Sequence, residues 1–199
     1  MPVAVEQRVE TAGLSAELPP LLRLAAAYAP GPARPAWTAL LALDHRLSRA
    51  VTGASSPLLA QLKLAWWRDR MRTSAAQWPR GEPLLAALAR FDGERAALEA
   101  LVDGWEGLIG EEAGEGAFER LAQARGGAVA ALARTIGCPA DPRAIAALAR
   151  GWTVPGAQRA ADRLPRGLRP LVVLANLPRP DEAGPVALSR IVRLGMLGR

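Results

Sequence analysis

The side chains of this sequence that are best suited to chemistry lie on one predicted helix, in the segment ALLALDHRLSRAVTG. Asp44 and His45 stand side by side there, and Arg46 and Arg49 follow within the next five residues. Two carboxylates at i and i+4 project from one helix face and can share Mg²⁺, whereas guanidinium groups bind phosphate oxygens through paired hydrogen bonds. Two arginines beside a single carboxylate therefore disfavour a divalent cation and suit an anionic ligand.

A second predicted helix, Leu59–Met71, carries two adjacent tryptophans, Trp66 and Trp67, followed by Arg68 and Asp69. Adjacent residues on a helix diverge by about 100°, so both indoles cannot face one pocket squarely. We expect one tryptophan in the core and the other in a groove or interface, with two pocket walls as the alternative. Arg68 and Asp69 are interpreted as a surface ion pair, and Arg68 is also a candidate ligand for phosphate.

Three further acidic pairs have the i, i+4 spacing of a metal site: Glu99 with Asp103, Glu111 with Glu115, and Glu115 with Glu119. The first pair lies opposite an apolar stripe, and the other two lie in or beside a glycine-containing loop. We expect a solvated helix edge at the first pair, where a metal role is the less favoured alternative, and a metal role is less favoured again at the other two pairs.

The composition excludes several classes of function. A single cysteine, Cys138, cannot form an intrachain disulfide, and with His45 as the only histidine it cannot build the usual zinc site. The net charge is +6, and Lys63 is the only lysine. The arginines are spread along the chain without a basic block, so we expect no nucleic-acid partner. A phosphate ligand or an anionic membrane surface remains open.

The same sequence predicts an all-α protein. Half of the residues are hydrophobic, alanine, leucine and arginine dominate, and β-branched residues are sparse. Proline and glycine separate segments of helical periodicity, and Ser56-Pro57 and Asp141-Pro142 are helix-start signals. We expect residues 1–18 to be loosely ordered and residues 19–199 to form one antiparallel bundle of about eight helices. The predicted helices span residues 21–29, 35–51, 57–76, 83–91, 93–109, 118–136, 143–151 and 171–177, with an amphipathic tail from 186 to 197.

Several of these segments resemble the squalene/phytoene synthase family and its non-catalytic relatives in respiratory complex I assembly. Pro30, Arg34 and residues 39–43 stand in the order of the family's proline turn, arginine and ALYAF-like helix. Residues 63–69, KLAWWRD, resemble the family's RLQWWRDAL helix, and residues 118–133 loosely resemble the helix after its midpoint loop. The resemblance extends over residues 20–177, firmly to about residue 72. It implies the isoprenoid synthase fold in a shortened form.

The resemblance also implies a chemistry whose acidic residues are mostly absent. In the family's enzymes two aspartate pairs hold Mg²⁺ ions, which grip the diphosphates of two prenyl substrates. Placed on this chain without gaps, the first pair falls on Ser48 and Thr52 and the second on Asp162 and Arg166. Asp44 and Asp162 are the only remaining candidates for a catalytic carboxylate. The resemblance thus predicts no metal site, and Mg²⁺ as a cofactor only if the family activity survives.

Two functions follow from this resemblance. The leading hypothesis is a pseudoenzyme that has lost prenyl coupling and acts as a binding or assembly protein with a protein partner. The alternative is a divergent transferase or binder of farnesyl or geranylgeranyl diphosphate in isoprenoid biosynthesis. In that case Arg34, Arg46, Arg49 and Arg68 would hold the diphosphate in place of metal, and the two tryptophans would line the prenyl pocket.

The sequence predicts a cytoplasmic protein, because it shows no signal-peptide pattern and no apolar run of about 20 residues. Residues 186–199 form a basic amphipathic segment that could contact a membrane peripherally. Packing of this segment against the domain is the competing interpretation.

Overall fold

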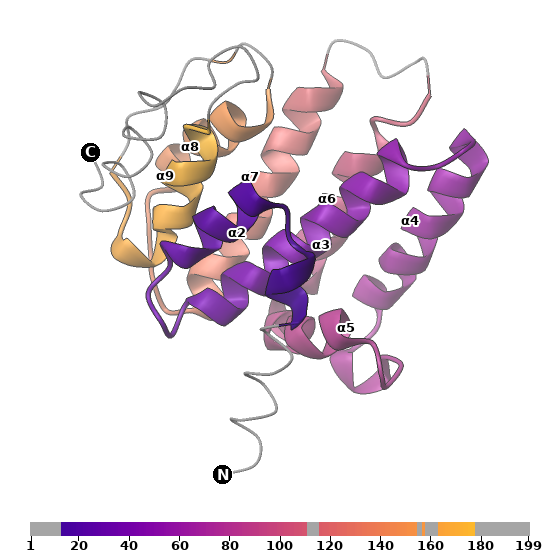
Figure 1. The fold of residues 1–199 in the computed structure, drawn as a ribbon, viewed down its shortest axis with the longest axis horizontal. Helices are drawn as coiled ribbons and strands as arrows, with labels where there is room; N and C mark the ends of the chain where they lie inside the picture. Colours follow the sequence, from indigo (N-terminus) through magenta and orange to yellow (C-terminus); the bar gives the residue numbers. More distant parts are fainter. Residues whose placement is uncertain (1–12, 111–115, 155–156, 158–162, 178–199) are drawn as a thin grey trace.

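Helices make up all the regular secondary structure in the described part of the chain, which confirms the all-α prediction. The computed structural model describes residues 13–110, 116–154, 157 and 163–177. The helices pack side by side as a bundle, shown in Figure 1. One hydrophobic core runs through them, from Leu14 near the start of the described chain to Ala175 near its end.

Most of the predicted helices are found within a few residues of their expected bounds. The α-helices are α2 (Pro20–Ala27), α3 (Arg34–Thr52), α4 (Pro57–Arg72), α5 (Pro83–Leu88), α6 (Arg95–Glu106), α7 (Ala117–Thr135), α8 (Pro142–Thr153) and α9 (Arg169–Ala175). Short 3₁₀ turns lie at η1 (Ala75–Gln77), η2 (Ala89–Glu94) and η3 (Arg166–Leu168).

Helix α3 lies at the centre of the bundle and contacts α2, α4, α5, α6 and α7. Every residue from 36 to 44 is buried, so this helix is apolar on almost all sides for more than two turns. The indole of Trp37 is fully buried, and its Nε1 donates to the carbonyl of Gly167 at 2.8 Å. That bond fastens α3 to the turn before α9. A polar side chain in this part of α3 must find a partner inside the protein.

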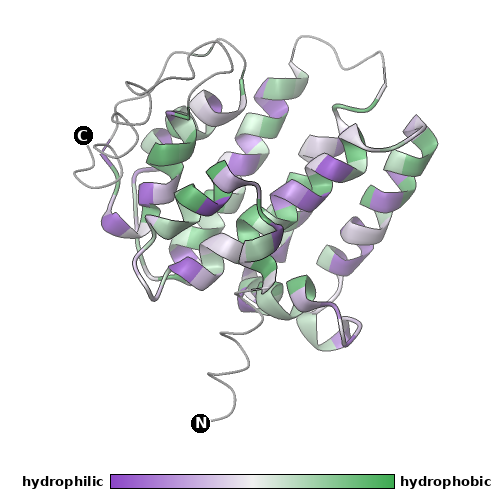
Figure 2. Cartoon of the chain, in the orientation of Figure 1, coloured by the Kyte–Doolittle hydropathy of each residue, from purple (hydrophilic) through white to green (hydrophobic). Residues whose placement is uncertain are grey.

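Helix α4 lies at the edge of the bundle and packs on α6 and α3 (Figure 1). The hydroxyl of Ser56 accepts from the backbone N–H of Leu59 at 3.3 Å, which confirms the predicted N-cap. One side of α4 is buried, through Ala60, Leu64, Trp67 and Met71. Green and purple residues alternate along the outer helices in Figure 2, as expected for amphipathic elements.

Small residues bring α6, α7 and α8 close together. A Cβ added at Gly104 of α6 would lie 2.8 Å from the Cβ of Ala124 in α7. Gly126 of α7 faces Ala149 of α8, where an added Cβ would lie at an ordinary contact distance of 3.5 Å. The glycines that weaken these helices locally thus allow close packing. The side chain of Asp141 accepts from the N–H of Arg143 and begins α8, as predicted.

Two helix ends differ from the prediction. The segment predicted as helix from 57 to 76 ends at Arg72, because Thr73 is extended, and a separate 3₁₀ turn follows. The indole Nε1 of Trp78 then donates to the carbonyl of Arg70 at 2.7 Å and folds this turn back on α4. The segment predicted from 83 to 91 changes to 3₁₀ geometry after Leu88, and Phe91 leaves helical geometry altogether. Tertiary contacts override helix periodicity at both positions.

Some predictions fall outside the described residues, namely those for Glu111 and Glu115, for Asp162 and for the tail at 186–199. Within the segment 1–18, the described residues 13–17 are helical, and Leu14 and Leu18 are buried. Among the described residues, no helix has the length and apolar character needed to cross a bilayer.

Candidate functional site

Asp44 lies at the centre of a buried polar network. Only 3 % of its surface is exposed, and the guanidinium of Arg125 donates to both of its carboxylate oxygens. Arg125 Nε lies 2.9 Å from Oδ1, and Arg125 Nη2 lies 2.8 Å from Oδ2. The indole Nε1 of Trp105 donates a third hydrogen bond to Oδ1 at 2.9 Å. Because α3, α6 and α7 supply one residue each, the network joins three helices.

The guanidinium of Arg125 is enclosed by aromatic rings. Its central carbon lies 4.0 Å from the ring centroid of Trp152 and 5.0 Å from that of Trp105. Its remaining Nη1 donates to the hydroxyl of Thr153 at 3.2 Å, which brings α8 into the network. A buried charge that is paired, hydrogen-bonded and stacked in this way is neutralised inside the protein.

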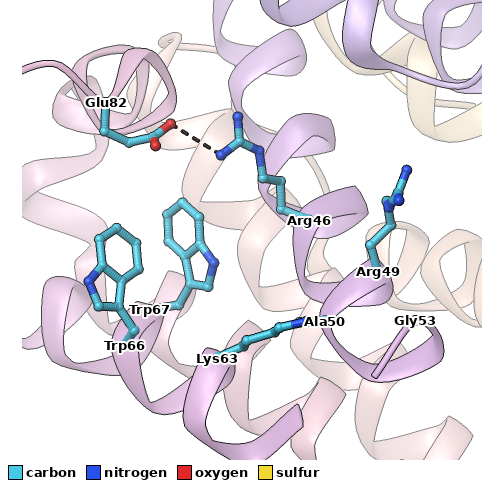
Figure 3. A pocket seen from close by; sticks show the side chains of 8 residues that line it. All are labelled: Arg46, Arg49, Ala50, Gly53, Lys63, Trp66, Trp67 and Glu82. Atoms are coloured by element: carbon cyan, nitrogen blue, oxygen red, sulfur yellow. Dashed lines mark hydrogen bonds and ion pairs between the residues drawn. The ribbon is translucent and has the colours of Figure 1, made fainter. Parts of the chain in front are cut away.

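A cleft of about 420 Å³ opens between α3 and α4 (Figure 3). Its lining combines cationic side chains with two indoles. The lining residues are Arg46, Arg49, Ala50, Gly53, Lys63, Trp66, Trp67 and Glu82. The structure therefore brings two of the four predicted arginines together with both predicted tryptophans.

The charges of this cleft are only partly neutralised. Arg46 donates to Glu82 at 3.2 Å and to Glu17 at 3.0 Å, so its charge is shared with two carboxylates. Arg49 and Lys63 are exposed and form no ion pair with any described residue. The pKa of the neighbouring His45 is lowered, first by its partial burial and then by the positive charge of Arg49. The cleft thus has an excess of positive charge that suits an anion.

The two tryptophans divide between core and cleft. Trp67 is 7 % exposed and Trp66 is 41 % exposed, in agreement with the divergence of adjacent helix residues. Their rings meet edge to face, with centroids 4.9 Å apart and planes at 89°. The guanidinium of Arg70 lies 5.6 Å from the centroid of Trp66. Both indoles nevertheless line the cleft.

The other two predicted arginines lie elsewhere. Arg34 donates to the carbonyls of Ala27 and Ala29 and holds the turn after α2. Arg68 forms ion pairs with Asp103, at 2.8 Å, and with Glu106. Burial opposes its charge, but the hydrogen bonds that its guanidinium donates to both carboxylates leave the pKa of Arg68 raised. These two guanidinium groups are engaged in helix packing and are not directed into the cleft.

Part of the chain is similar to a known protein family. Residues 22–111 match the family model of squalene/phytoene synthase. This segment begins within α2 and includes α3 to α6. This part of the chain belongs to the squalene/phytoene synthase family. No curated protein and no solved structure matches the chain. Asp44 and the cleft between α3 and α4 lie inside the squalene/phytoene synthase segment, whereas Arg125 lies beyond it.

Within the described part of the chain, the residues around Asp44 do not fit the Mg²⁺ ions that the family's enzymes bind. The carboxylate of Asp44 is already occupied by three hydrogen bonds and an ion pair. Ser48 and Thr52 supply no carboxylate, and the hydroxyl of Thr52 donates to the carbonyl of Ser48 at 3.0 Å. No group of three metal-binding side chains occurs among the residues that the structure describes. Hard divalent cations need several free oxygen ligands, which this arrangement does not offer.

The acidic pair Glu99 and Asp103 has a structural role. Glu99 accepts from Arg72 at 2.6 Å, and Asp103 accepts from Arg68, so both carboxylates join α6 to α4. The side chain of Asp103 is 54 % exposed, so this helix edge is solvated as expected, and it also contacts α4. Both acidic residues contact arginines four residues apart on the facing helix, and no metal role is needed to explain their spacing.

Sequence reasoning missed the four other members of the Asp44 network: Trp105, Arg125, Trp152 and Thr153. Arg125 is separated from Asp44 by 81 residues, so no local spacing in the sequence connects the two. The available signal was indirect, because Asp44 stands in a continuous apolar stretch of α3. A charged residue at such a position requires a partner of opposite charge.

Proposed function

We propose that this member of the squalene/phytoene synthase family does not couple prenyl diphosphates and acts as a binding protein. The observation that carries the proposal is the hydrogen bonding of the Asp44 carboxylate inside the protein. This carboxylate is committed to Arg125 and Trp105, so it is not available to hold a metal–diphosphate complex. Ser48 and Thr52 support the same conclusion, because hydroxyls are poor substitutes for carboxylates as ligands of Mg²⁺.

A turnover assay tests the loss of chemistry. The full chain is incubated with farnesyl or geranylgeranyl diphosphate and Mg²⁺, and diphosphate release is measured together with the prenyl products. We expect no release above the rate without protein. Release that depends on protein and Mg²⁺ would refute the proposal, and retention of that release in Asp44→Asn would place the chemistry outside the Asp44 network.

The cleft between α3 and α4 favours a second candidate function, metal-independent binding of a prenyl diphosphate. Arg49 and Lys63 offer two cationic groups without a carboxylate partner among the described residues. Trp66 and Trp67 offer apolar surface beside them. A ligand with a phosphate group and an apolar chain matches both parts of this lining, and guanidinium groups bind phosphate without a metal.

Calorimetry tests this second candidate in the presence of a chelator. We expect farnesyl diphosphate to bind without Mg²⁺ and Arg49→Ala to weaken its affinity roughly tenfold, the effect of losing one charge-assisted hydrogen bond. Arg143→Ala is the matched control. Arg143 is exposed on α8, forms no ion pair among the described residues, and lies outside the cleft. Absence of binding heat, or equal weakening by both substitutions, would eliminate the cleft as the binding site.

A further inference from the structure

Helix α4 carries an exposed apolar face in addition to its buried one. Leu58 and Leu62 are 64 % and 59 % exposed, and Leu59 and Trp66 are 44 % and 41 % exposed. We name these four residues the α4 stripe. They account for four of the six large hydrophobic side chains that are exposed in the described chain. An apolar patch of this kind on an edge helix commonly marks an interaction surface.

The α4 stripe has regular geometry. Leu58, Leu62 and Trp66 follow one another at intervals of four residues, so they lie above one another along the helix. Leu64 and Met71 point to the opposite side and are buried against the bundle. Helix α4 therefore has apolar residues on two sides, and only one of them is used by the fold. Trp66 is the only exposed tryptophan among the six of the chain.

Positive charge borders the α4 stripe along one edge. Lys63 of α4 and Arg49 of α3 both line the cleft (Figure 3), and the guanidinium of Arg70 lies 5.6 Å from the ring centroid of Trp66. On the other edge of α4, Arg68 and Arg72 are neutralised by carboxylates of α6. Asp69 is the only exposed acidic residue of α4. The surface thus combines leucines, an exposed indole and a row of cations with few acidic groups.

We propose that the α4 stripe docks on the surface of a bilayer that contains anionic phospholipid, with α4 lying parallel to the membrane plane. Leucines on one face of a helix enter the boundary between headgroups and acyl chains, and tryptophan prefers that same boundary. Lys63 and Arg49 then meet the lipid phosphates, where each basic residue adds to the attraction. The net charge of +6 favours approach to such a surface. This proposal goes beyond the proposed function and does not require any prenyl ligand.

Vesicle flotation with the full chain tests the docking. We expect the protein to float with vesicles of phosphatidylcholine and phosphatidylglycerol, and to float less with phosphatidylcholine alone or at high salt. Leu62→Glu is expected to lower the partition coefficient roughly tenfold or more, because an inserted leucine is replaced by a charge. Gln61→Glu is the matched control, because it makes the same charge change at an exposed position of α4 outside the stripe. We expect this control to retain most of the binding.

Tryptophan fluorescence gives an independent measurement. Lipids brominated on their acyl chains should quench the emission of Trp66, and the quenching should disappear in Trp66→Phe. The other five tryptophans are more buried, so their emission should be affected less. Circular dichroism checks that the helices of Leu62→Glu are intact. We expect them to be, because Leu62 is exposed.

Three outcomes would overturn the proposal. The first is equal flotation of wild type, Leu62→Glu and Gln61→Glu. The second is loss of flotation in Ile191→Glu alone, which would assign the contact to the amphipathic tail. The third is absence of flotation in wild type together with a concentration-dependent dimer that Leu62→Glu dissociates, because the stripe would then bind a second copy of the chain. None of these outcomes depends on prenyl-diphosphate turnover, so failure here is distinguishable from failure of the proposed function.

Discussion

The guanidinium of Arg125 meets the carboxylate of Asp44 edge to edge, with two nearly parallel hydrogen bonds of 2.9 and 2.8 Å. This pair is the only described ion pair in which both side chains are at most 10 % exposed. It joins α3, which belongs to the family segment, to α7, which lies beyond that segment. An internal guanidinium thus neutralises the charge of this buried carboxylate.

Removal of Arg125 should strongly destabilise the protein. Arg125→Met leaves the carboxylate of Asp44 buried without its counter-charge, so we expect the free energy of unfolding to fall by about 3–5 kcal/mol. The double variant Asp44→Leu/Arg125→Met should recover most of this loss, although the indole N–H of Trp105 would then lack an acceptor. Urea denaturation of the single and double variants measures the coupling.

An exposed ion pair provides the control for this cycle. Arg134 contacts Glu94 through two hydrogen bonds of 2.7 Å, but its side chain is 60 % exposed. Arg134→Ala should therefore cost less than about 1 kcal/mol. If Arg125→Met costs no more than this control, the buried pair does not stabilise the bundle as we infer.

The helical framework could be read from the sequence because each helix carries its own local signals. Proline at the start and apolar residues at helical spacing indicated α3, α4 and α8 within about two residues, apart from the early end of α4, and α4 and α8 also have a polar N-cap. The early end depends on Trp78, whose indole binds a carbonyl in the last turn of α4. That contact is a tertiary one and leaves no periodic signal in the sequence.

The candidate site could be predicted only in part. The tryptophan pair and the two arginines of α3 were visible because they are neighbours on two adjacent helices. The partner of Asp44 was not visible, because it stands on a distant helix and many arginines could have taken its place. Two other predicted arginines do not belong to the cleft. Arg34 binds carbonyls at and after the end of α2, and Arg68 binds carboxylates of α6.

Two glycines should respond oppositely to substitution by alanine. A Cβ at Gly104 would lie 2.8 Å from that of Ala124, so Gly104→Ala should force α6 and α7 apart and cost about 1–3 kcal/mol. Gly127 lies in the middle of α7 with nothing within 4 Å of its added Cβ. Gly127→Ala should therefore stabilise the protein by about 0.5–1 kcal/mol. Thermal unfolding of both variants checks the sign, and equal shifts would contradict the close approach of α6 and α7.

Acid should destabilise the protein through Asp92. The N–H of Ala75 donates to its carboxylate at 2.7 Å, and together with Arg95 this bond lowers the pKa of Asp92 below its ordinary value of 3.8. The unfolded chain therefore takes up this proton first as the pH falls below 3.8. The contribution of Asp92 is fully present above that pH and is lost as the pH falls through the lower folded pKa. Asp92→Asn should flatten the acid limb of a urea-stability profile, and an unchanged slope would speak against this contact.

His45 should report directly on the charge of the cleft. Its partial burial and the neighbouring Arg49 lower its pKa below 6.5, while Asp44 and Glu17 raise it and offset part of the shift. Since the folded state disfavours the imidazolium, its contribution to stability is complete above pH 6.5 and decreases as the pH falls below that value. His45 is the only histidine, so its Cε1–H gives one NMR resonance whose titration can be followed without assignment. We expect the pKa of His45 to rise in Arg49→Ala and to stay unchanged in Arg143→Ala.

Inorganic diphosphate should raise the pKa of His45 in the wild type and have less effect in Arg49→Ala, because an anion bound in the cleft cancels the same positive charge. A resonance that titrates identically with and without diphosphate would place the anion outside this cleft.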